Sequence, residues 1–374
     1  MAEALKDFFS AARVRELGEA LGRVHPQFPV AAFVRSASRG LTDLELVARA
    51  RHIAAALARH LPPRYEDAVA VLLTSLGPEH TSDELLGVGM APFFYMPHLV
   101  FVAEHGLDHF ELSMAAQREL TKRFTAEFSI RAFLERHPER TLAVLREWAS
   151  DPNPHVRRLV SEGTRPRLPW APRVRWLEEH PERLLPLLER LKDDPTPVVR
   201  RSVANHLNDL GKARPALLFD TCRAWLVGAS AARRALVQHA LRSAAKRGEA
   251  GALDLLGHGA RPRLRVAKVR FEPPRTPIGG KVRVTFTLVS EATAAQALRV
   301  DLAVLFVKAR GDARAKVFNV ARVELDAGAR VELAKTVSLA VHSTRVPRPG
   351  VHAVEARVNG AAFSLGDFVV LPEE

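Results

Sequence analysis

The sequence of 374 residues contains a single cysteine, Cys222. One thiol excludes an intrachain disulfide and a cysteine-based metal cage, and it suits a reducing cytosol. No stretch approaches the roughly 20 uninterrupted apolar residues of a membrane-spanning helix, and the N-terminus lacks the apolar run of a signal peptide. We therefore expect a cytoplasmic protein without a membrane segment, in which Cys222 is a packed thiol.

Signals for a bound cofactor are also scarce. We find no glycine-rich phosphate loop, and Gly279-Gly280 is typical of a turn. His105 and His109 have metal-like spacing, but no third ligand is apparent, and Gly106 disfavours a helix between them. We expect neither a metal nor a cofactor.

Acidic residues are few relative to basic ones: 42 Asp and Glu face 55 Lys and Arg, a formal net charge of +13. Residues 1–125 hold 13 basic and 15 acidic side chains, residues 126–260 hold 23 and 16, and residues 261–374 hold 19 and 11. The excess is mostly arginine, whose planar guanidinium suits phosphate, so it favours a polyanionic partner. Arginine enrichment from a GC-rich genome is the alternative on charge alone.

An internal repeat begins at the point where the basic excess begins. The run Asp-Pro-Asn-Pro at 151–154 returns 43 positions later as Asp-Pro-Thr-Pro at 194–197, and the run His-Pro-Glu-Arg at 137–140 returns at 180–183. This period lies within the roughly 40–47 residues of HEAT-type helical pairs. Such pairs stack into a solenoid with a concave binding face, and proline is tolerated in the first turn of a helix.

Hydrophobic periodicity predicts helices up to about residue 258 and strands beyond it. The expected fold is a HEAT-like α-helical solenoid over residues 1–258, followed by an antiparallel, immunoglobulin-like β-sandwich over residues 262–374. The expected helices are 1–25, 41–59, 65–76, 99–105, 110–121, 133–136, 139–149, 155–161, 182–192, 198–208, 215–227 and 231–247. The expected strands are 264–271, 281–289, 298–308, 316–325, 330–339, 352–358 and 363–371.

Three segments resemble AlkC-type DNA alkylation repair proteins. They are Phe-Thr-Ala-Glu-Phe-Ser-Ile-Arg-Ala-Phe-Leu at 124–134, the run from Asp151 to Trp170, and Val-Arg-Arg-Ser-Val-Ala-Asn-His-Leu-Asn-Asp at 199–209. The resemblance implies a HEAT-like DNA glycosylase that excises N3-methylated bases, such as 3-methyladenine and 3-methylcytosine, from the sugar side and without a deep pocket. Some members of the family carry an added immunoglobulin-like domain, which would fit residues 262–374.

The candidate catalytic carboxylates are Glu127, Glu162 and Asp209, all within the matched segments. An N3-methylated base is cationic and leaves readily, so an enzyme needs chiefly to stabilise an oxocarbenium-like sugar and to direct water onto C1′. Glu162 is the most suggestive because the next repeat carries Asn205 at its position. The alternative for each is a solvated or helix-capping carboxylate.

Trp170 follows Pro166 and Pro169, and a rigid loop there could present its indole for stacking on a sugar or on a cationic base. A core position is the alternative on spacing alone, and the resemblance favours the functional role. Trp148 and Trp176 fit a helical core instead. Five arginines are candidate phosphate contacts, with surface ion pairing as the alternative: Arg157, Arg158, Arg165, Arg200 and Arg201.

Two functional hypotheses follow from these observations. The first is a monomeric DNA glycosylase whose partner is double-stranded DNA containing alkylated bases. The second is a HEAT-repeat scaffold that binds nucleic acid or protein and catalyses nothing. Carboxylates and an indole that converge in one basic trough would favour the first hypothesis.

Overall fold

The computed structural model describes residues 5–80, 90–169, 171–259, 261–307, 313–341 and 346–372. The chain divides into two compact units, one of residues 1–210 with 229–240 and the other of residues 211–228 with 241–374. The change from helices to strands near residue 260 lies inside the second unit. The domain limits expected from the sequence, 1–258 and 262–374, therefore stay a prediction.

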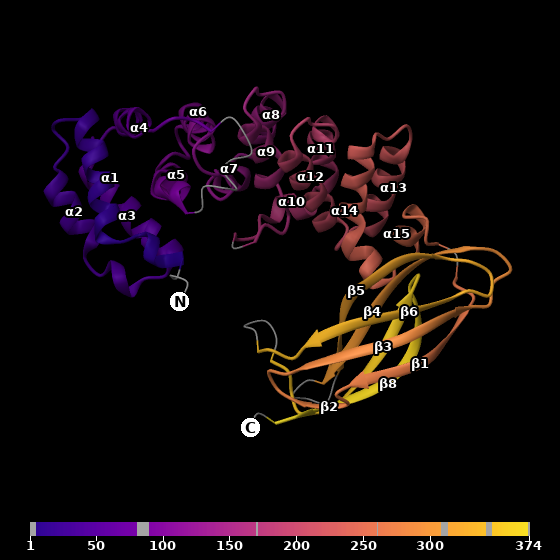
Figure 1. Cartoon of the computed structure of the whole chain (residues 1–374). Helices are drawn as coiled ribbons and strands as arrows, with labels where there is room; N and C mark the ends of the chain where they lie inside the picture. Colours follow the sequence, from indigo (N-terminus) through magenta and orange to yellow (C-terminus); the bar gives the residue numbers. More distant parts are fainter. Residues whose placement is uncertain are drawn as a thin grey trace. The chain divides into compact units, whose positions relative to one another are not determined.

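Helices occupy the chain up to Leu255 (Figure 1). Among the described residues, none of them is both long and apolar enough to cross a membrane. The α-helices are α1 (Ala11–Val24), α2 (Val30–Ser38), α3 (Leu46–His60), α4 (Tyr65–Thr74), α5 (Met96–His105), α6 (Phe110–Thr121), α7 (Ile130–Arg136), α8 (Pro138–Trp148), α9 (Pro154–Gly163), α10 (Arg175–Glu179), α11 (Leu185–Leu191), α12 (Pro197–Leu210), α13 (Pro215–Leu226), α14 (Ala231–Arg247) and α15 (Ala250–Leu255). Short 3-10 helices are η1 (Leu5–Phe8), η2 (Leu41–Asp43), η4 (Ala91–Tyr95) and η5 (Pro181–Arg183).

The repeat predicted from the sequence is present as helix pairs. Pro154 opens α9 and Pro197 opens α12, and α9 packs against α12. The expected helix over 41–59 is interrupted, because Leu44 adopts extended backbone angles between η2 and α3. Cys222 is buried, as predicted, and burial raises the pKa of its thiol to about 12.

Asp151 and Asp194 shape the turns that join the helices of each pair. The Oδ1 atom of Asp151 accepts the N–H of Asn153 at 2.8 Å, and that of Asp194 accepts the N–H of Thr196 at 2.9 Å. Both aspartates are therefore turn residues, as the sequence predicts. The repeated Asp-Pro-x-Pro run thus gives the same turn twice.

An arginine from the helix that follows holds each of these turns. Arg157 donates to the carbonyls of Asp151 and Pro152 at 2.8 and 3.0 Å. Arg200 donates in the same way to the carbonyls of Asp194 and Pro195. The first arginine of each Arg-Arg pair thus satisfies backbone acceptors of its own turn.

The C-terminal strands form two sheets, with strand orders β1-β3-β6 and β2-β8-β7-β4-β5. All pairs are antiparallel except β2 with β8. The strands are β1 (Leu264–Glu272), β2 (Arg275–Pro277), β3 (Lys281–Ser290), β4 (Gln296–Val307), β5 (Ala313–Leu325), β6 (Arg330–Ser338), β7 (Gly350–Val358) and β8 (Ala361–Leu371).

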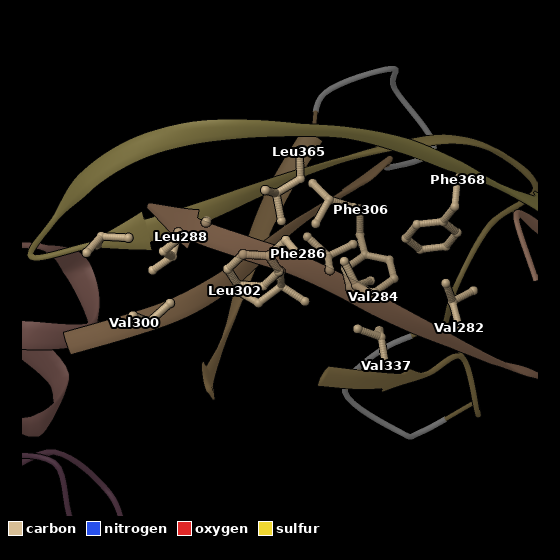
Figure 2. Close-up of a cluster of buried hydrophobic side chains, with 14 of the residues drawn as sticks. Val282, Val284, Phe286, Leu288, Val300, Leu302, Phe306, Val337, Leu365 and Phe368 are labelled. Carbon is tan, nitrogen blue, oxygen red and sulfur yellow. The ribbon is translucent and has the colours of Figure 1, made fainter. Parts of the chain in front are cut away.

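Alternating side chains of these strands fill the core of the sandwich. On β3, Val284 and Phe286 are fully buried, whereas Lys281 and Arg283 are exposed. Figure 2 shows the inward side chains of β3 beside those of β4, β6 and β8. The predicted α-then-β fold with an antiparallel sandwich is confirmed, and the added strand β2 has only three residues.

We expect Arg157→Ala to lower the free energy of unfolding of the first unit (residues 1–210 with 229–240, called the helical unit below) by about 3 kcal/mol. The substitution leaves the buried carboxylate of Asp194 without its ion-pair partner. The Arg157 side chain is 13% exposed and that of Asp194 is 3% exposed, and Arg157 Nε lies 2.6 Å from Asp194 Oδ2. Urea unfolding followed by helical circular dichroism measures the change. The control is Arg201→Ala, an exposed position where we expect a change within about 0.5 kcal/mol. Equal losses in the two variants would contradict this assignment.

Candidate functional site

The three candidate carboxylates lie in one connected network within the helical unit. Glu127 precedes α7, Glu162 lies in the last turn of α9, and Asp209 lies in the last turn of α12. Arg158 links the first two, with its Nη2 atom 3.0 Å from Glu127 Oε2 and 3.9 Å from Glu162 Oε1. Arg165 links the last two, with its Nη1 atom 2.6 Å from Glu162 Oε1 and its Nη2 atom 2.8 Å from Asp209 Oδ2.

The two oxygens of Glu127 are in different situations. Oε2 accepts the hydroxyl of Thr125 at 2.6 Å and the guanidinium of Arg158. Arg158 also donates to Thr125 Oγ1 at 3.2 Å, which fixes all three side chains together. Among the described residues, Oε1 has no hydrogen-bond partner, and the side chain is 12% exposed. Glu127 is thus held by one oxygen and can accept a hydrogen bond through the other.

Glu162 has both of its oxygens occupied. Oε1 accepts from Arg165, and Oε2 accepts the hydroxyl of Ser202 at 2.6 Å. Burial raises the pKa of Glu162, but the charges of Arg158 and Arg165 outweigh that effect, and the net pKa is lowered. Glu162 is therefore a buried anion, held by its partners in one orientation.

Gly163 allows the end of α9 to lie against the turn that carries Glu127. A Cβ atom at position 163 would be 2.6 Å from Ile130 Cγ2 and 3.9 Å from Glu127 Cα. The first distance is too short for a real Cβ atom, whereas the second is an ordinary contact. A side chain at 163 would therefore have to displace Ile130, the first residue of α7.

The five candidate arginines are in four different situations. Arg158 and Arg165 face the carboxylates. Arg157 donates all five of its N–H groups to Asp194, Thr196 and two carbonyls, so the ion-pairing alternative describes it best. Arg200 holds a turn. Arg201 is exposed, and in the described part of the chain its side chain has no ion pair or hydrogen bond.

Trp170 lies outside the described residues, so its predicted role stays a prediction. Trp148 is buried, as expected of a core residue. Trp176 is only half-buried, with its ring centroid 5.0 Å from that of His180.

The sequence did not point to Arg131, whose guanidinium contacts the backbone of two segments, at Gly163 and Arg165 and at Pro172. It donates to the carbonyls of Gly163 and Arg165 at 3.1 and 2.9 Å, and twice to the carbonyl of Pro172 at 3.1 and 2.9 Å. The residue is 3% exposed, and burial lowers the pKa of its guanidinium to about 10. In the sequence, Arg131 is distinguished only as a charged residue between apolar positions of α7.

A pocket of about 500 Å³ adjoins this network. Thr125 and Arg131 are part of its wall, together with apolar side chains that include Leu99, Phe124 and Phe128. Glu127, Glu162 and Asp209 do not line it. The carboxylates are therefore presented outside this apolar pocket.

Comparison with known proteins agrees with this architecture. The family model described as "DNA alkylation repair enzyme" matches residues 122–247, and that of the "Uncharacterised protein YhaZ, C-terminal Ig-like domain" matches residues 265–372. The uncharacterized protein YhaZ of Bacillus subtilis is 31% identical over 367 residues, which cover 98% of this chain and 99% of that protein.

A solved structure extends the similarity over the whole fold. The Pseudomonas fluorescens alkylpurine DNA glycosylase AlkC, bound to DNA containing an abasic site analog, has 34% sequence identity and a TM-score of 0.91, covering 99% of this chain and 100% of that one. The helical repeats over residues 122–247 thus match the class of DNA alkylation repair enzymes. The chain belongs to the AlkC-type family with a C-terminal immunoglobulin-like domain, which confirms the resemblance found in the sequence.

We expect Glu162→Gln to destabilise the protein in a pH-dependent way. Because the pKa of Glu162 is lowered in the folded state, its ionised form stabilises the fold above the pKa of the unfolded chain. The difference in urea midpoint between the wild type and Glu162→Gln should be full above about pH 5 and should shrink as the pH falls through the folded pKa. The control, Glu147→Gln, changes an exposed glutamate of α8. A difference that stays constant with pH would refute this account of Glu162.

Proposed function

We propose that this protein is a DNA glycosylase that hydrolyses the N-glycosidic bond of cationic N3-alkylated bases, 3-methyladenine and 3-methylcytosine, in double-stranded DNA. The observation that carries the proposal is the network itself, in which Glu127, Glu162 and Asp209 share Arg158 and Arg165. Its formal charge is −1, which suits a developing positive charge on a sugar. Further support comes from the AlkC relative, an alkylpurine DNA glycosylase by name.

The chemistry requires little beyond these groups. Methylation at N3 makes the base cationic, so the C1′–N bond breaks without an added acid, and its electron pair leaves with the base. The sugar passes through an oxocarbenium-like state, which a nearby carboxylate stabilises. Water then adds its oxygen to C1′ and gives its proton to the carboxylate or to solvent. No cofactor enters any of these steps.

We assign the water-orienting role to Glu127. Its Oε2 is fixed by Thr125 and Arg158, and its Oε1 can accept a hydrogen bond from water. Glu162 is less suited because both of its oxygens already accept hydrogen bonds. Asp209 is 2% exposed and takes two N–H groups of Arg165. Glu162 and Asp209 then supply negative potential and hold the arginines in place.

The arginines divide their roles in this proposal. Arg158 and Arg165 orient carboxylates, while Arg201 remains exposed for a phosphate. Trp170 would stack on the sugar or on the cationic base, and Arg131 would position the segment that carries it through Pro172 and Arg165. All these residues belong to one chain, so the proposed site needs no second subunit.

We expect Glu127→Gln to reduce base release by about 100-fold. The amide keeps the shape of the side chain but removes the charge that favours the oxocarbenium-like sugar. The measurement is release of 3-methyladenine from methylated duplex DNA in a single turnover at saturating protein. Affinity for DNA should be unchanged or slightly tighter, because the variant has lost a negative charge.

The matched control is Glu147→Gln, which should release the base at the wild-type rate. Wild-type activity in Glu127→Gln would refute the assignment of the water-orienting role. If the wild type binds methylated duplex yet frees no base, the non-catalytic scaffold is the correct function.

A second expectation concerns salt. Arg201→Ala should lower the slope of log affinity against log salt concentration by about 1, the effect of one lost phosphate contact. Arg157→Ala, assayed at a temperature where it stays folded, should leave the slope unchanged because its N–H groups are engaged within the protein. The reverse result would restore Arg157 as the phosphate contact.

A further inference from the structure

A basic hollow lies among the N-terminal helices. Residues of α2 and α3, with Arg39 just after α2, line an open pocket of about 380 Å³. Its polar lining consists of three arginines, two histidines and one serine: Arg35, Ser36, Arg39, His52, Arg59 and His60. No carboxylate lines it. None of these residues belongs to the carboxylate network, so the hollow is a separate feature of the helical unit.

The arginines of this hollow differ from most others in the unit. Arg118, Arg157 and Arg158 each pair with a carboxylate at 3.0 Å or less. Arg35 and Arg59 are exposed, and over the described ranges neither has an ion pair or a hydrogen bond of its side chain. Arg39 is in the same situation. Guanidinium groups that share one hollow repel each other unless an anion lies between them.

The helix dipole is the alternative explanation for part of this arrangement. Arg35 lies in the last turn of α2, and Arg59 and His60 lie in the last turn of α3, where cations are favourable. The dipole accounts for one cation at each helix end. It does not account for the convergence of both ends, with Arg39, around one concavity. Burial and the charges of Arg59 and Arg35 lower the pKa of His60, as expected of uncompensated positive charge.

Hydrogen bonds within the hollow orient the side chains of Ser36, His52 and His60. Ser36 Oγ donates to the carbonyl of Phe33 at 3.1 Å, so His60 Nε2, at 3.0 Å, must donate to Ser36 Oγ. His52 Nε2 donates to the carbonyl of Ser36 at 3.2 Å. Both imidazoles are therefore oriented, and in the described structure neither Nδ1 atom has a partner. The hollow thus combines hydrogen-bonded Ser36, His52 and His60 with three exposed guanidinium groups.

We propose that this hollow binds a phosphate group, gripped by the guanidinium groups of Arg35, Arg39 and Arg59. Guanidinium forks match phosphate oxygens in geometry and charge. The phosphate can come from the backbone of bound DNA or from a free phosphate monoester, since both present the same oxygens. The site lies outside the proposed catalytic network, so the loss of its arginines should leave the rate of base release at saturating protein unchanged.

The test compares two double variants that lose the same charge. Arg35→Ala with Arg59→Ala removes two arms of the hollow, and Arg15→Ala with Arg64→Ala removes two exposed arginines elsewhere. One arm of the experiment titrates inorganic phosphate by calorimetry, and the other titrates undamaged duplex DNA by fluorescence anisotropy. Circular dichroism checks that both variants are folded.

We expect the Arg35/Arg59 variant to lose about tenfold in affinity relative to the control variant, as for the loss of a charge-assisted hydrogen bond. A loss for DNA identifies a backbone phosphate as the occupant, and a loss for inorganic phosphate alone identifies a free phosphate monoester. If both titrations match those of the control variant, the proposal is wrong. Base release at saturating protein should be equal in the two variants, which separates this test from that of the catalytic proposal.

Discussion

Two guanidinium groups shared among three carboxylates are the interaction on which the helical unit depends. A buried charge is costly unless it is paired, and Arg158 and Arg165 each serve two acidic partners. The network joins the turn before α7 to the ends of α9 and α12, and these segments lie far apart in sequence. Three carboxylates and two guanidinium groups leave the network with a formal charge of −1, within a region that is otherwise basic. Folding and the proposed chemistry therefore use one set of contacts.

The tandem arginines of the repeat show how one motif supplies two tasks. The first arginine of each pair folds back onto the Asp-Pro-x-Pro turn of its own repeat, as Arg157 and Arg200 do. The second arginine does not contact this turn, and in α9 it is Arg158, which pairs with Glu127 and Glu162. At the corresponding place in α12, Arg201 is exposed. The first arginine thus has the same role in both repeats, whereas the second has a different environment in each.

Much of this organisation can be predicted from the sequence. The 43-residue repeat predicts the helix pairs, and period-two patterns predict every strand except β2, which is too short to show a period. The expected helices do not include α2, which follows a segment with two prolines, or α10 and α15, which are too short to show a helical period. No role was expected for Arg131, because its acceptors are carbonyls, which leave no trace in side-chain identity. The sequence likewise cannot show that Arg157 reaches Asp194, since that partner belongs to the next repeat.

The absence of a side chain at position 163 has a broader implication. The space that a Cβ atom would need there is already filled by the Cγ2 methyl group of Ile130, 2.6 Å away. Ile130 is the first residue of α7, so a larger residue at 163 would have to displace the start of that helix. Glu127 precedes α7 by only a few residues, and a substitution far from any charge could thus disturb the position of a carboxylate.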